Sequence, residues 1–317
     1  KDVQLWDVSV QKQIEVSGSD SYKLVQLMTC RDLSGAKVLK CYYVPLIDGN
    51  GNMINDPLVL KVEDMKWRIC IADSDVLLYA KGIADSMNLN VQIHETEIST
   101  LAVQGPKSLD VMKKVFGDEI SKLKFFNFNY FKFEGIDFMI SKSGFSKQGG
   151  YEIYVENLKS GLKLYDYIIK VGKKFNLKPG CPNVIERIEG ALLSYGNDMD
   201  NNDNPFECGL DKYVNLDSNI EFLGKKALQK AKSEGIKRKL MGVKIKEKNI
   251  NLTAEIALVN ENKKTIGYLR SAVYSPRFKM IVGIAMINLD YCNVSQNFKI
   301  NINNKEASGS VCSLPMN

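Results

Sequence analysis

The side chains that could do chemistry in this 317-residue chain are limited, because it has a single histidine, His94. His94 lies in the polar stretch 92–97 with no evident partner, so a loop or surface histidine is expected there and not a member of a triad. The chain has no phosphate-binding G-x-x-x-x-G-K-[ST] loop, no G-x-S-x-G elbow, no G-x-G-x-x-G turn and no H-E-x-x-H motif. General acid–base work would fall on carboxylates, tyrosines or lysines, which favours a reaction that needs no proton shuttle.

The cysteine and charge content excludes further classes. The seven cysteines are odd in number and widely spaced without a C-x-x-C pair, so neither a zinc site nor a disulfide framework is expected, and no metal is predicted. The net charge of +6 is spread along the chain, and the densest basic stretch, 225–248, also carries Glu234 and Glu247. A solvated surface is expected there in place of a nucleic-acid groove. No apolar run approaches the ~20 residues that cross a bilayer, so a cytoplasmic protein without a membrane partner is predicted.

Three charged residues are candidates for a binding site, although each taken alone has an ordinary explanation. Asp56 follows a glycine-containing turn and could merely close it. Glu152 lies in a predicted strand and could pair with a neighbouring strand, while Arg187 and Glu189 could be solvated charges on a helix.

The elements that position these residues follow from apolar periodicity and turn signals. A hairpin at residues 49–51 is expected to join two of the strands, and Pro106 favours a helix start. Helices are predicted at residues 19–28, 74–87, 107–116, 158–175, 185–194 and 225–239. Strands are predicted at residues 3–16, 41–47, 58–62, 67–72, 101–103, 125–140 and 151–155.

The stretch from residue 240 to the end is almost wholly strand and turn. An α+β protein is therefore predicted, with two mixed α+β units at residues 1–103 and 104–232 and an all-β domain at residues 233–317.

Several motifs occur in a fixed order over nearly the whole chain. They are Gly51-Asn-Met-Ile-Asn-Asp56 before a strand, Leu101-Ala-Val-Gln-Gly-Pro106, Ser143-Gly-Phe-Ser-Lys-Gln-Gly-Gly-Tyr-Glu152-Ile-Tyr154, Arg187-Ile-Glu-Gly-Ala-Leu-Leu-Ser-Tyr-Gly-Asn-Asp198, and Ser271-Ala-Val-Tyr-Ser-Pro276 with Ile284-Ala-Met-Ile287. In this order they resemble the glycine-cleavage T-protein (aminomethyltransferase) family. The resemblance implies a three-domain assembly around a central folate channel, with a C-terminal β-barrel.

The resemblance also assigns roles to single residues. It implies tetrahydrofolate as the acceptor, held by Tyr43, Asp56, Glu152 and Arg187. A carboxylate such as Glu152 can accept both donors of a pterin edge. Asp56 is predicted as the catalytic residue, in an orienting and electrostatic role near the folate nitrogens, and Arg187 would pair with a carboxylate or a ring carbonyl.

Three segments within the family pattern look like its dimethylsulfoniopropionate demethylase branch. They are Ser146-Lys-Gln-Gly-Gly-Tyr151, Pro179-Gly-Cys-Pro-Asn183 and Asn201-Asn-Asp-Asn-Pro-Phe-Glu-Cys-Gly209. The implied small-molecule donor is a sulfonium, which passes its methyl group to N5 of tetrahydrofolate and leaves as 3-(methylthio)propionate. A cation of this kind is best held by aromatic faces, here assigned to Trp6, Phe145, Tyr151 and Tyr154.

Two other functions stay open. A glycine-cleavage T-protein would pass a methylene group from an aminomethyl-lipoyl carrier to folate, and a non-catalytic folate-binding scaffold would show a Lys-Gly-Cys-Tyr-x-Gly-Gln motif, which the chain lacks. The chain begins at Lys1, and the resemblance implies a further N-terminal segment that contributes to the donor pocket. A homodimer is also left open.

Overall fold

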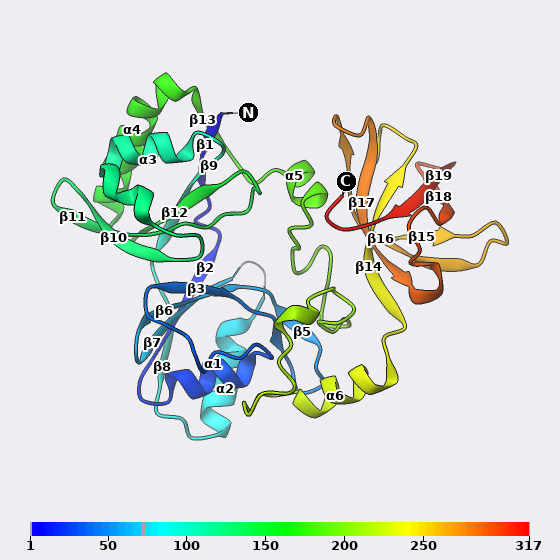
Figure 1. Ribbon diagram of the computed structural model, residues 1–317, viewed down its shortest axis with the longest axis horizontal. Coiled ribbons are helices and arrows are strands. Elements are labelled where there is room, and N and C mark those ends of the chain that lie inside the picture. Colours follow the sequence, from blue (N-terminus) through cyan, green and yellow to red (C-terminus); the bar gives the residue numbers. More distant parts are fainter. Residues whose placement is uncertain (1, 72–73, 317) are drawn as a thin grey trace. The chain divides into compact units, whose positions relative to one another are not determined.

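The computed structural model describes residues 2–71 and 74–316, which form two compact units (Figure 1). Unit 1 consists of Lys1–Val44 and Asn55–Pro182, and unit 2 of Pro45–Ile54 and Asn183–Asn317. The predicted α+β class with an all-β C-terminal part is confirmed. The three predicted domain ranges and the central channel stay predictions.

The first sheet of unit 1 is six-stranded, and it carries Glu152. β1 and β13 are parallel, whereas the other neighbouring strands are antiparallel. In spatial order its strands are β10 (Phe128–Phe133), β11 (Ile136–Ser141), β12 (Gly150–Val155), β9 (Ser99–Gln104), β1 (Val3–Asp7) and β13 (Leu177–Gly180).

The second sheet of unit 1 is five-stranded and antiparallel. In spatial order its strands are β3 (Lys40–Tyr43), β6 (Leu58–Glu63), β7 (Lys66–Ile71), β2 (Lys12–Ser17) and β8 (Gln92–Glu95). The prediction of a single strand at residues 3–16 is wrong, because β1 and β2 belong to different sheets. A turn closed by the hydrogen bond from Gln11 N to Val8 O (2.9 Å) separates the two strands. The predicted strand 67–72 corresponds to β7, and residue 72 lies outside the described part of the chain.

Helices cover one side of each sheet (Figure 1). α3 (Ser108–Phe116) and α4 (Leu158–Gly172) pack on the first sheet, and α1 (Ser21–Met28) and α2 (Val76–Ser86) pack on the second. α4 begins after Asn157, whose side chain accepts a hydrogen bond from Ser160 N (3.0 Å) and so satisfies one free N–H of the first turn.

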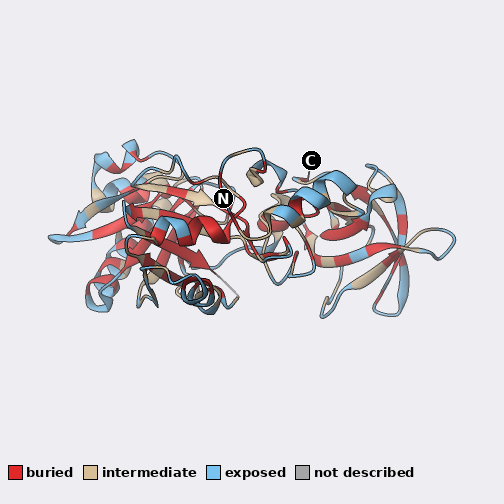
Figure 2. Ribbon diagram, turned by 90° about the horizontal axis from the view of Figure 1, so that it is seen from below, coloured by how far each residue is buried: buried red, intermediate tan, exposed pale blue. Residues whose placement is uncertain are grey.

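The other sides of the two sheets face each other. Gln13 of β2 donates to Thr100 of β9 (2.9 Å), and Arg68 of β7 pairs with Glu156 (2.9 Å), just after β12. Apolar side chains fill the space between the sheets, and they include residues of both sheets, namely Cys41, Leu60, Val62, Cys70, Phe128, Met139 and Tyr154. Figure 2 shows that the strands in the interior of unit 1 are mostly buried.

Unit 2 is built around a closed barrel of antiparallel strands. In order around the barrel these are β14 (Arg238–Ile245), β17 (Met280–Asn288), β16 (Thr265–Ser275), β15 (Ile256–Val259), β18 (Asn297–Ile302) and β19 (Lys305–Cys312). The small hairpin of β4 (Leu46–Ile47) and β5 (Met53–Asn55) and the helices α5 (Val184–Glu189) and α6 (Lys225–Glu234) precede the barrel in the chain.

Two helix ends differ from the sequence prediction. α5 stops five residues early, because Ala191 adopts a left-handed φ of 52° and Leu192 N bonds back to Arg187 O (2.8 Å). α6 stops at Glu234, where Gly235 has a φ of 76° that favours glycine, and Arg238 already begins β14.

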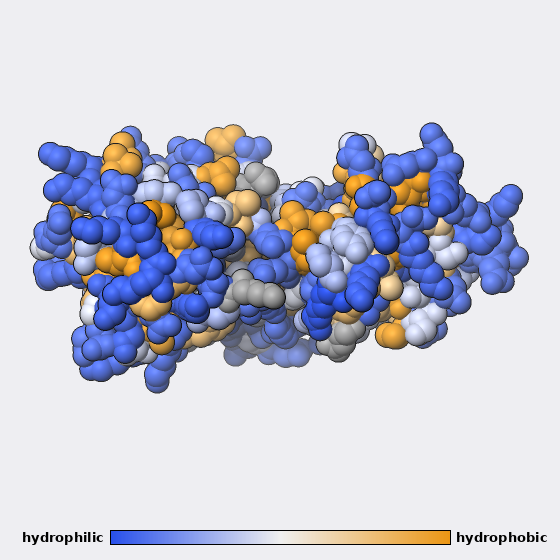
Figure 3. Space-filling view, turned by 90° about the horizontal axis from the view of Figure 1, so that it is seen from above, coloured by the Kyte–Doolittle hydropathy of each residue, from blue (hydrophilic) through white to orange (hydrophobic). Residues whose placement is uncertain are grey.

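The surface carries no large apolar area on the face drawn in Figure 3, where hydrophobic residues form small separate patches among hydrophilic ones. Such scattered exposure is ordinary for a protein in water. None of the described helices is both long and apolar enough to cross a membrane.

Candidate functional site

One row of residues crosses the first sheet of unit 1 and carries two predicted site residues. Trp6 of β1 lies opposite Ala102 of β9, Ala102 lies opposite Glu152 of β12, and Glu152 lies opposite Ser141 of β11. Residues opposite one another in adjacent strands point to the same face, so this row shares one face of the sheet. Ala102, which lies between Trp6 and Glu152 in this row, has only a methyl side chain. The backbones of Trp6 and Glu152 are about 10 Å apart, which is two strand spacings.

The carboxylate of Glu152 is buried and hydrogen-bonded. Its side chain is 8% exposed, and its Oε2 accepts a hydrogen bond from the Ser143 hydroxyl. Burial raises the pKa of Glu152, while the neighbouring hydroxyls of Ser143, Ser141 and Tyr154 act in the opposite direction. A buried carboxyl group with one oxygen committed to the protein is suited to bind a ligand that offers N–H donors.

Asp56 and Tyr43 form a second polar group, at the entrance of β6. The Tyr43 hydroxyl donates to Asp56 Oδ2 (2.8 Å), and the backbone carbonyl of Tyr43 accepts from Arg31 (2.7 Å). Asn55 accepts from Asp56 N through its side-chain oxygen (3.0 Å), which fixes the turn before the strand. Tyr43 and Asp56, each predicted separately as a folate-binding residue, are thus joined by a hydrogen bond.

These two polar groups lie on facing sides of the two sheets. On the second sheet Tyr43 is opposite Leu58, and Leu58 is opposite Cys70, so the three residues share a face with the inter-sheet core. Glu152 on the first sheet contributes to raising the pKa of Cys70, after the larger effect of burial. Tyr43, Glu152 and Trp6 therefore all point to the space between the sheets, and Asp56 is bonded to one of them.

Phe145 lies on a loop that is fastened to Gln104 of β9. The Gln104 amide donates to Ser143 O (3.1 Å) and accepts from the Ser146 hydroxyl (2.7 Å). A Cβ atom at Gly144 or at Gly150 would overlap this amide, so a larger residue at either position would displace Gln104 from the loop. The loop leaves the Phe145 side chain half-buried.

The remaining predicted rings are enclosed. Trp6 is buried and donates from its indole nitrogen to Gln4 (2.8 Å). Tyr151 is 1% exposed and lies on the helix-covered face, opposite to the face of Glu152, because neighbouring strand residues alternate. Tyr154 is 2% exposed in the inter-sheet core, and its hydroxyl bonds to Ser141 (3.2 Å). The predicted donor-binding role of Tyr151 gains no support from this placement.

Arg187 belongs to unit 2 and is engaged in a buried ion pair. Its Nη1 lies 2.6 Å from Asp198 Oδ2, and its Nη2 donates to the Ser271 hydroxyl (3.0 Å). Asp198 also accepts from Ser194 N (2.9 Å), so α5, the segment after it and β16 are held together. A guanidinium has five N–H donors, and this arrangement therefore leaves capacity for a further acceptor.

Sequence reasoning missed Ser141, Ser143 and Gln104. Ser143 lies within a motif that the sequence analysis singled out, but its link to Glu152 depends on the pairing of β11 with β12. Strand alternation would have placed Glu152 and Tyr154 on one face and Tyr151 on the other.

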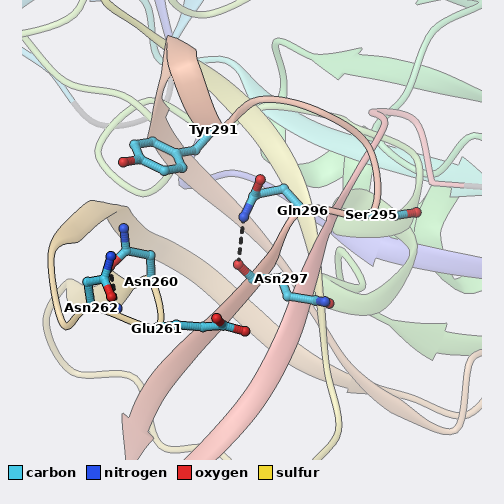
Figure 4. Close-up of a pocket in the computed structure, with 7 residues that line it drawn as sticks. All are labelled: Asn260, Glu261, Asn262, Tyr291, Ser295, Gln296 and Asn297. Atoms are coloured by element: carbon cyan, nitrogen blue, oxygen red, sulfur yellow. Dashed lines mark hydrogen bonds between the residues drawn. The ribbon is translucent and has the colours of Figure 1, made fainter.

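A pocket of about 410 Å³ lies elsewhere, among loops that join strands of the barrel, and none of the predicted site residues lines it (Figure 4). Exposed and half-buried polar residues and one tyrosine form it, namely Asn260, Glu261, Asn262, Tyr291, Ser295, Gln296 and Asn297. Within the described ranges, no group of three or more His, Cys, Asp or Glu side chains is arranged to hold a metal ion.

The cysteines near the site are expected to be poor nucleophiles. Burial raises the pKa of Cys70 to about 12 and holds that of Cys41 well above its ordinary value, so both remain thiols at neutral pH. Cys181, in contrast, is exposed.

Treatment of the native protein with a thiol reagent, followed by peptide mass spectrometry, should label Cys181 at least ~10-fold faster than either buried cysteine. Equal rates in folded protein would contradict this burial.

Comparison with known proteins identifies the family. The family models of the GCVT N-terminal domain and of the glycine cleavage T-protein C-terminal barrel domain match residues 1–218 and 238–316. The dimethylsulfoniopropionate demethylase DmdA of Ruegeria pomeroyi is 37% identical over 286 residues, which cover 90% of this chain and 78% of that protein. The aminomethyltransferase of Thermoanaerobacter pseudethanolicus is 32% identical over 316 residues, which cover 98% and 84%.

A solved structure confirms the fold. The glycine cleavage system aminomethyltransferase T from Bartonella henselae superposes with a TM-score of 0.87 at 21% identity, over 99% of this chain and 86% of that chain. The sequence match extends over both family models, and the relatives named are enzymes that transfer or remove one-carbon groups. The chain therefore belongs to the glycine-cleavage T-protein (aminomethyltransferase) family, and the predicted enzyme of that family is confirmed.

Proposed function

We propose that this protein is a tetrahydrofolate-dependent demethylase that takes a methyl group from the sulfonium of dimethylsulfoniopropionate. The bond between sulfur and the methyl carbon breaks as a bond from N5 of tetrahydrofolate to that carbon forms. Sulfur keeps the bonding electron pair and leaves as the neutral thioether 3-(methylthio)propionate. N5 then releases its proton to water, which gives 5-methyltetrahydrofolate.

The observation that carries this proposal is the 37% identity to a dimethylsulfoniopropionate demethylase over 90% of the chain. The site in unit 1 agrees with the chemistry, because it has polar groups for orientation but no histidine among its residues. A thioether needs no proton on leaving, so alignment of the reacting atoms and exclusion of water are the main requirements.

The folate-binding residues are proposed to act by orientation. Glu152 would accept hydrogen bonds from the pterin edge, and Asp56, held by the Tyr43 hydroxyl at 2.8 Å, would orient the ring near its reactive nitrogens. Arg187 would pair with a carboxylate or a ring carbonyl through donors that Asp198 and Ser271 do not use. A cytoplasmic location and the oligomeric state are also left as predictions.

The test is incubation of the protein with tetrahydrofolate and one donor at a time. Dimethylsulfoniopropionate should yield 5-methyltetrahydrofolate and 3-(methylthio)propionate in equal amounts, measured by liquid chromatography with mass spectrometry. Methylamine and sulfonium analogues serve as comparison donors. No transfer from dimethylsulfoniopropionate by folded, folate-binding protein would reject the demethylase assignment.

Aminomethyl transfer is the second candidate, because an aminomethyltransferase is 32% identical over 98% of this chain. An aminomethyltransferase would act on an aminomethyl-lipoyl carrier, release ammonia and form methylenetetrahydrofolate. Folate-stimulated ammonia release, with no product from dimethylsulfoniopropionate, would favour this candidate.

Phe145 is expected to contribute an aromatic face to the sulfonium donor. Phe145→Ala should raise the KM for dimethylsulfoniopropionate by about 2- to 30-fold, because a lost cation–π face costs about 0.5–2 kcal/mol. Tetrahydrofolate affinity should change little, since only the donor carries the cation. Phe145→Trp is the matched control and should preserve or improve the KM. A normal KM in the alanine variant would remove Phe145 from the donor site.

A further inference from the structure

Three buried hydroxyl groups form a chain of hydrogen bonds that ends on Glu152. The Tyr154 Oη lies 3.2 Å from Ser141 Oγ, Ser141 Oγ lies 2.5 Å from Ser143 Oγ, and Ser143 donates to Glu152 Oε2. All three hydroxyl residues are at most 2% exposed. The reaction proposed above uses none of these hydroxyls.

The direction of the chain follows from the number of protons available. A hydroxyl has one proton to donate, so Ser143, which donates to the carboxylate, must accept from Ser141. Ser141 has then spent its own proton and must accept from Tyr154. Each donor therefore points towards the carboxylate, and such aligned bonds strengthen one another in a poorly solvated interior.

We propose that Tyr154, Ser141 and Ser143 are positioning residues, which hold the Glu152 side chain in place and keep it ionised to accept hydrogen bonds from folate. This inference rests on the proposed function in so far as it names folate as the ligand. Tyr154 thereby receives a different role. Its phenol group supports the folate site, whereas the sequence analysis placed its ring against the donor cation.

Among the described residues, the hydroxyl groups of Ser143, Ser141 and Tyr154 are the groups that favour the ionised form of Glu152. Within the described residues, the titratable groups that interact with it are Cys41 of β3, Cys70 of β7 and Tyr154. Burial raises the pKa of all three, so they stay protonated and uncharged at neutral pH. Arg68 lowers the pKa of Cys70, but it is paired with Glu15 and Glu156. The hydroxyl chain is thus the main group that favours the ionised form of Glu152.

The consequence is a specific pH dependence. Burial raises the pKa of Glu152 and the hydroxyls oppose that rise, so removing a hydroxyl raises the pKa further. The ionised fraction then falls at the acid end of the titration and recovers as the pH rises. A purely structural role would instead weaken folate binding equally at every pH.

The experiment follows the Glu152 carboxyl directly. Protein labelled with ¹³C at glutamate carboxyl carbons is titrated by NMR without ligand, and Glu152→Gln identifies the signal. Ser143→Ala should move the titration midpoint of Glu152 to higher pH, and Tyr154→Phe should move it in the same direction by less. Tyr154→Phe keeps the ring and its packing, so it carries the test if the serine variant does not fold.

Tyr151→Phe is the matched control for the midpoint. Tyr151 is the strand neighbour of Glu152 and is as buried as Tyr154, and its hydroxyl oxygen has no hydrogen-bond partner among the described residues. Its replacement should leave the midpoint unchanged. An unchanged midpoint in Ser143→Ala and Tyr154→Phe, or an equal move in Tyr151→Phe, would overturn the proposal.

Tetrahydrofolate titration by calorimetry then tests the link to the ligand. Ser143→Ala should bind about 10-fold more weakly at the acid end, the loss expected for one hydrogen bond to a charged group, and should approach the wild-type affinity at higher pH. An equal loss at all pH values would overturn the proposal. A further outcome separates the two proposals. If the Glu152 midpoint moves as expected in the variants but the wild-type protein binds no tetrahydrofolate, the positioning role is supported and the proposed function is rejected.

Discussion

Asp203→Ala is expected to lower the free energy of unfolding of unit 2 by about 3 kcal/mol, the lower end of the cost of breaking a buried ion pair, because each arginine keeps a second carboxylate partner. Asp203 is 0% exposed, and its carboxylate lies between Arg270 of β16 and Arg238 of β14, with Arg238 at 3.0 Å. It also accepts a hydrogen bond from Asp200 N (2.9 Å). In the alanine variant Arg238 would keep Glu207 (3.0 Å) and Arg270 would keep Glu255 (2.7 Å), but both would lose the buried carboxylate that they share.

Urea unfolding of the variant, followed by circular dichroism, measures this loss. The control is Glu306→Ala, which breaks the exposed pair between Glu306 and Lys299 (2.8 Å) in the same barrel. Because exposed pairs contribute about 0–1 kcal/mol, the control should change stability little. Similar losses in the two variants would show that Asp203 is not the buried centre of an ion network.

Asp203 also shows why the polar segment after α5 needs this network. Residues 197–204 form a polar run that has few apolar side chains with which to pack. Arg238 and Arg270 reach this run from two barrel strands, so charge pairing replaces apolar packing in fixing it. We therefore expect Asp203→Ala to loosen the segment that follows Arg187 as well.

Local patterns predicted the strands that carry the site better than they predicted how those strands pair. The strand around Glu152 followed from its β-prone residues between a Gly-Gly break and a polar stretch, and the structure has β12 there. Apolar and polar residues alternate along much of the stretch 3–16, yet β1 and β2 lie in different sheets. Alternation reports that one face is buried, but it does not say against which neighbour.

Helix length was misjudged for a similar reason. Residues 185–194 have helical periodicity, but α5 ends at Glu189 because Ala191 takes a left-handed conformation. The bonds from Arg187 to Leu192 O (3.5 Å) and to Asp198 (2.6 Å) stabilise that turn. These contacts join residues up to eleven positions apart, so a local pattern does not reveal them.

Within the site, the sequence indicated single residues but not the bonds between them. Asp56 and Tyr43 were both predicted, and the structure adds the hydrogen bond that joins them. The serines next to Glu152 carry no such signal, because serine is common in loops and its hydroxyl can bond to many groups. Their importance becomes visible only when the register of β11 and β12 sets Ser141 opposite Glu152.

Glu152→Ala is expected to weaken tetrahydrofolate binding by about 2–3 kcal/mol, or about 30- to 150-fold, since a buried pterin edge would lose its charged acceptor. The side chain is 8% exposed and one of its oxygens is already bonded to Ser143, so water cannot freely replace the missing carboxylate.

Glu152→Gln is the informative comparison. It keeps the shape and one acceptor oxygen but brings an NH₂ group, which faces either the Ser143 hydroxyl or the pterin donors. We expect its loss to be similar to that of alanine, because two donors then meet where the carboxylate accepted both. Calorimetric titration of folded variants with tetrahydrofolate measures the effect, and a wild-type affinity in both would show that Glu152 does not contact folate.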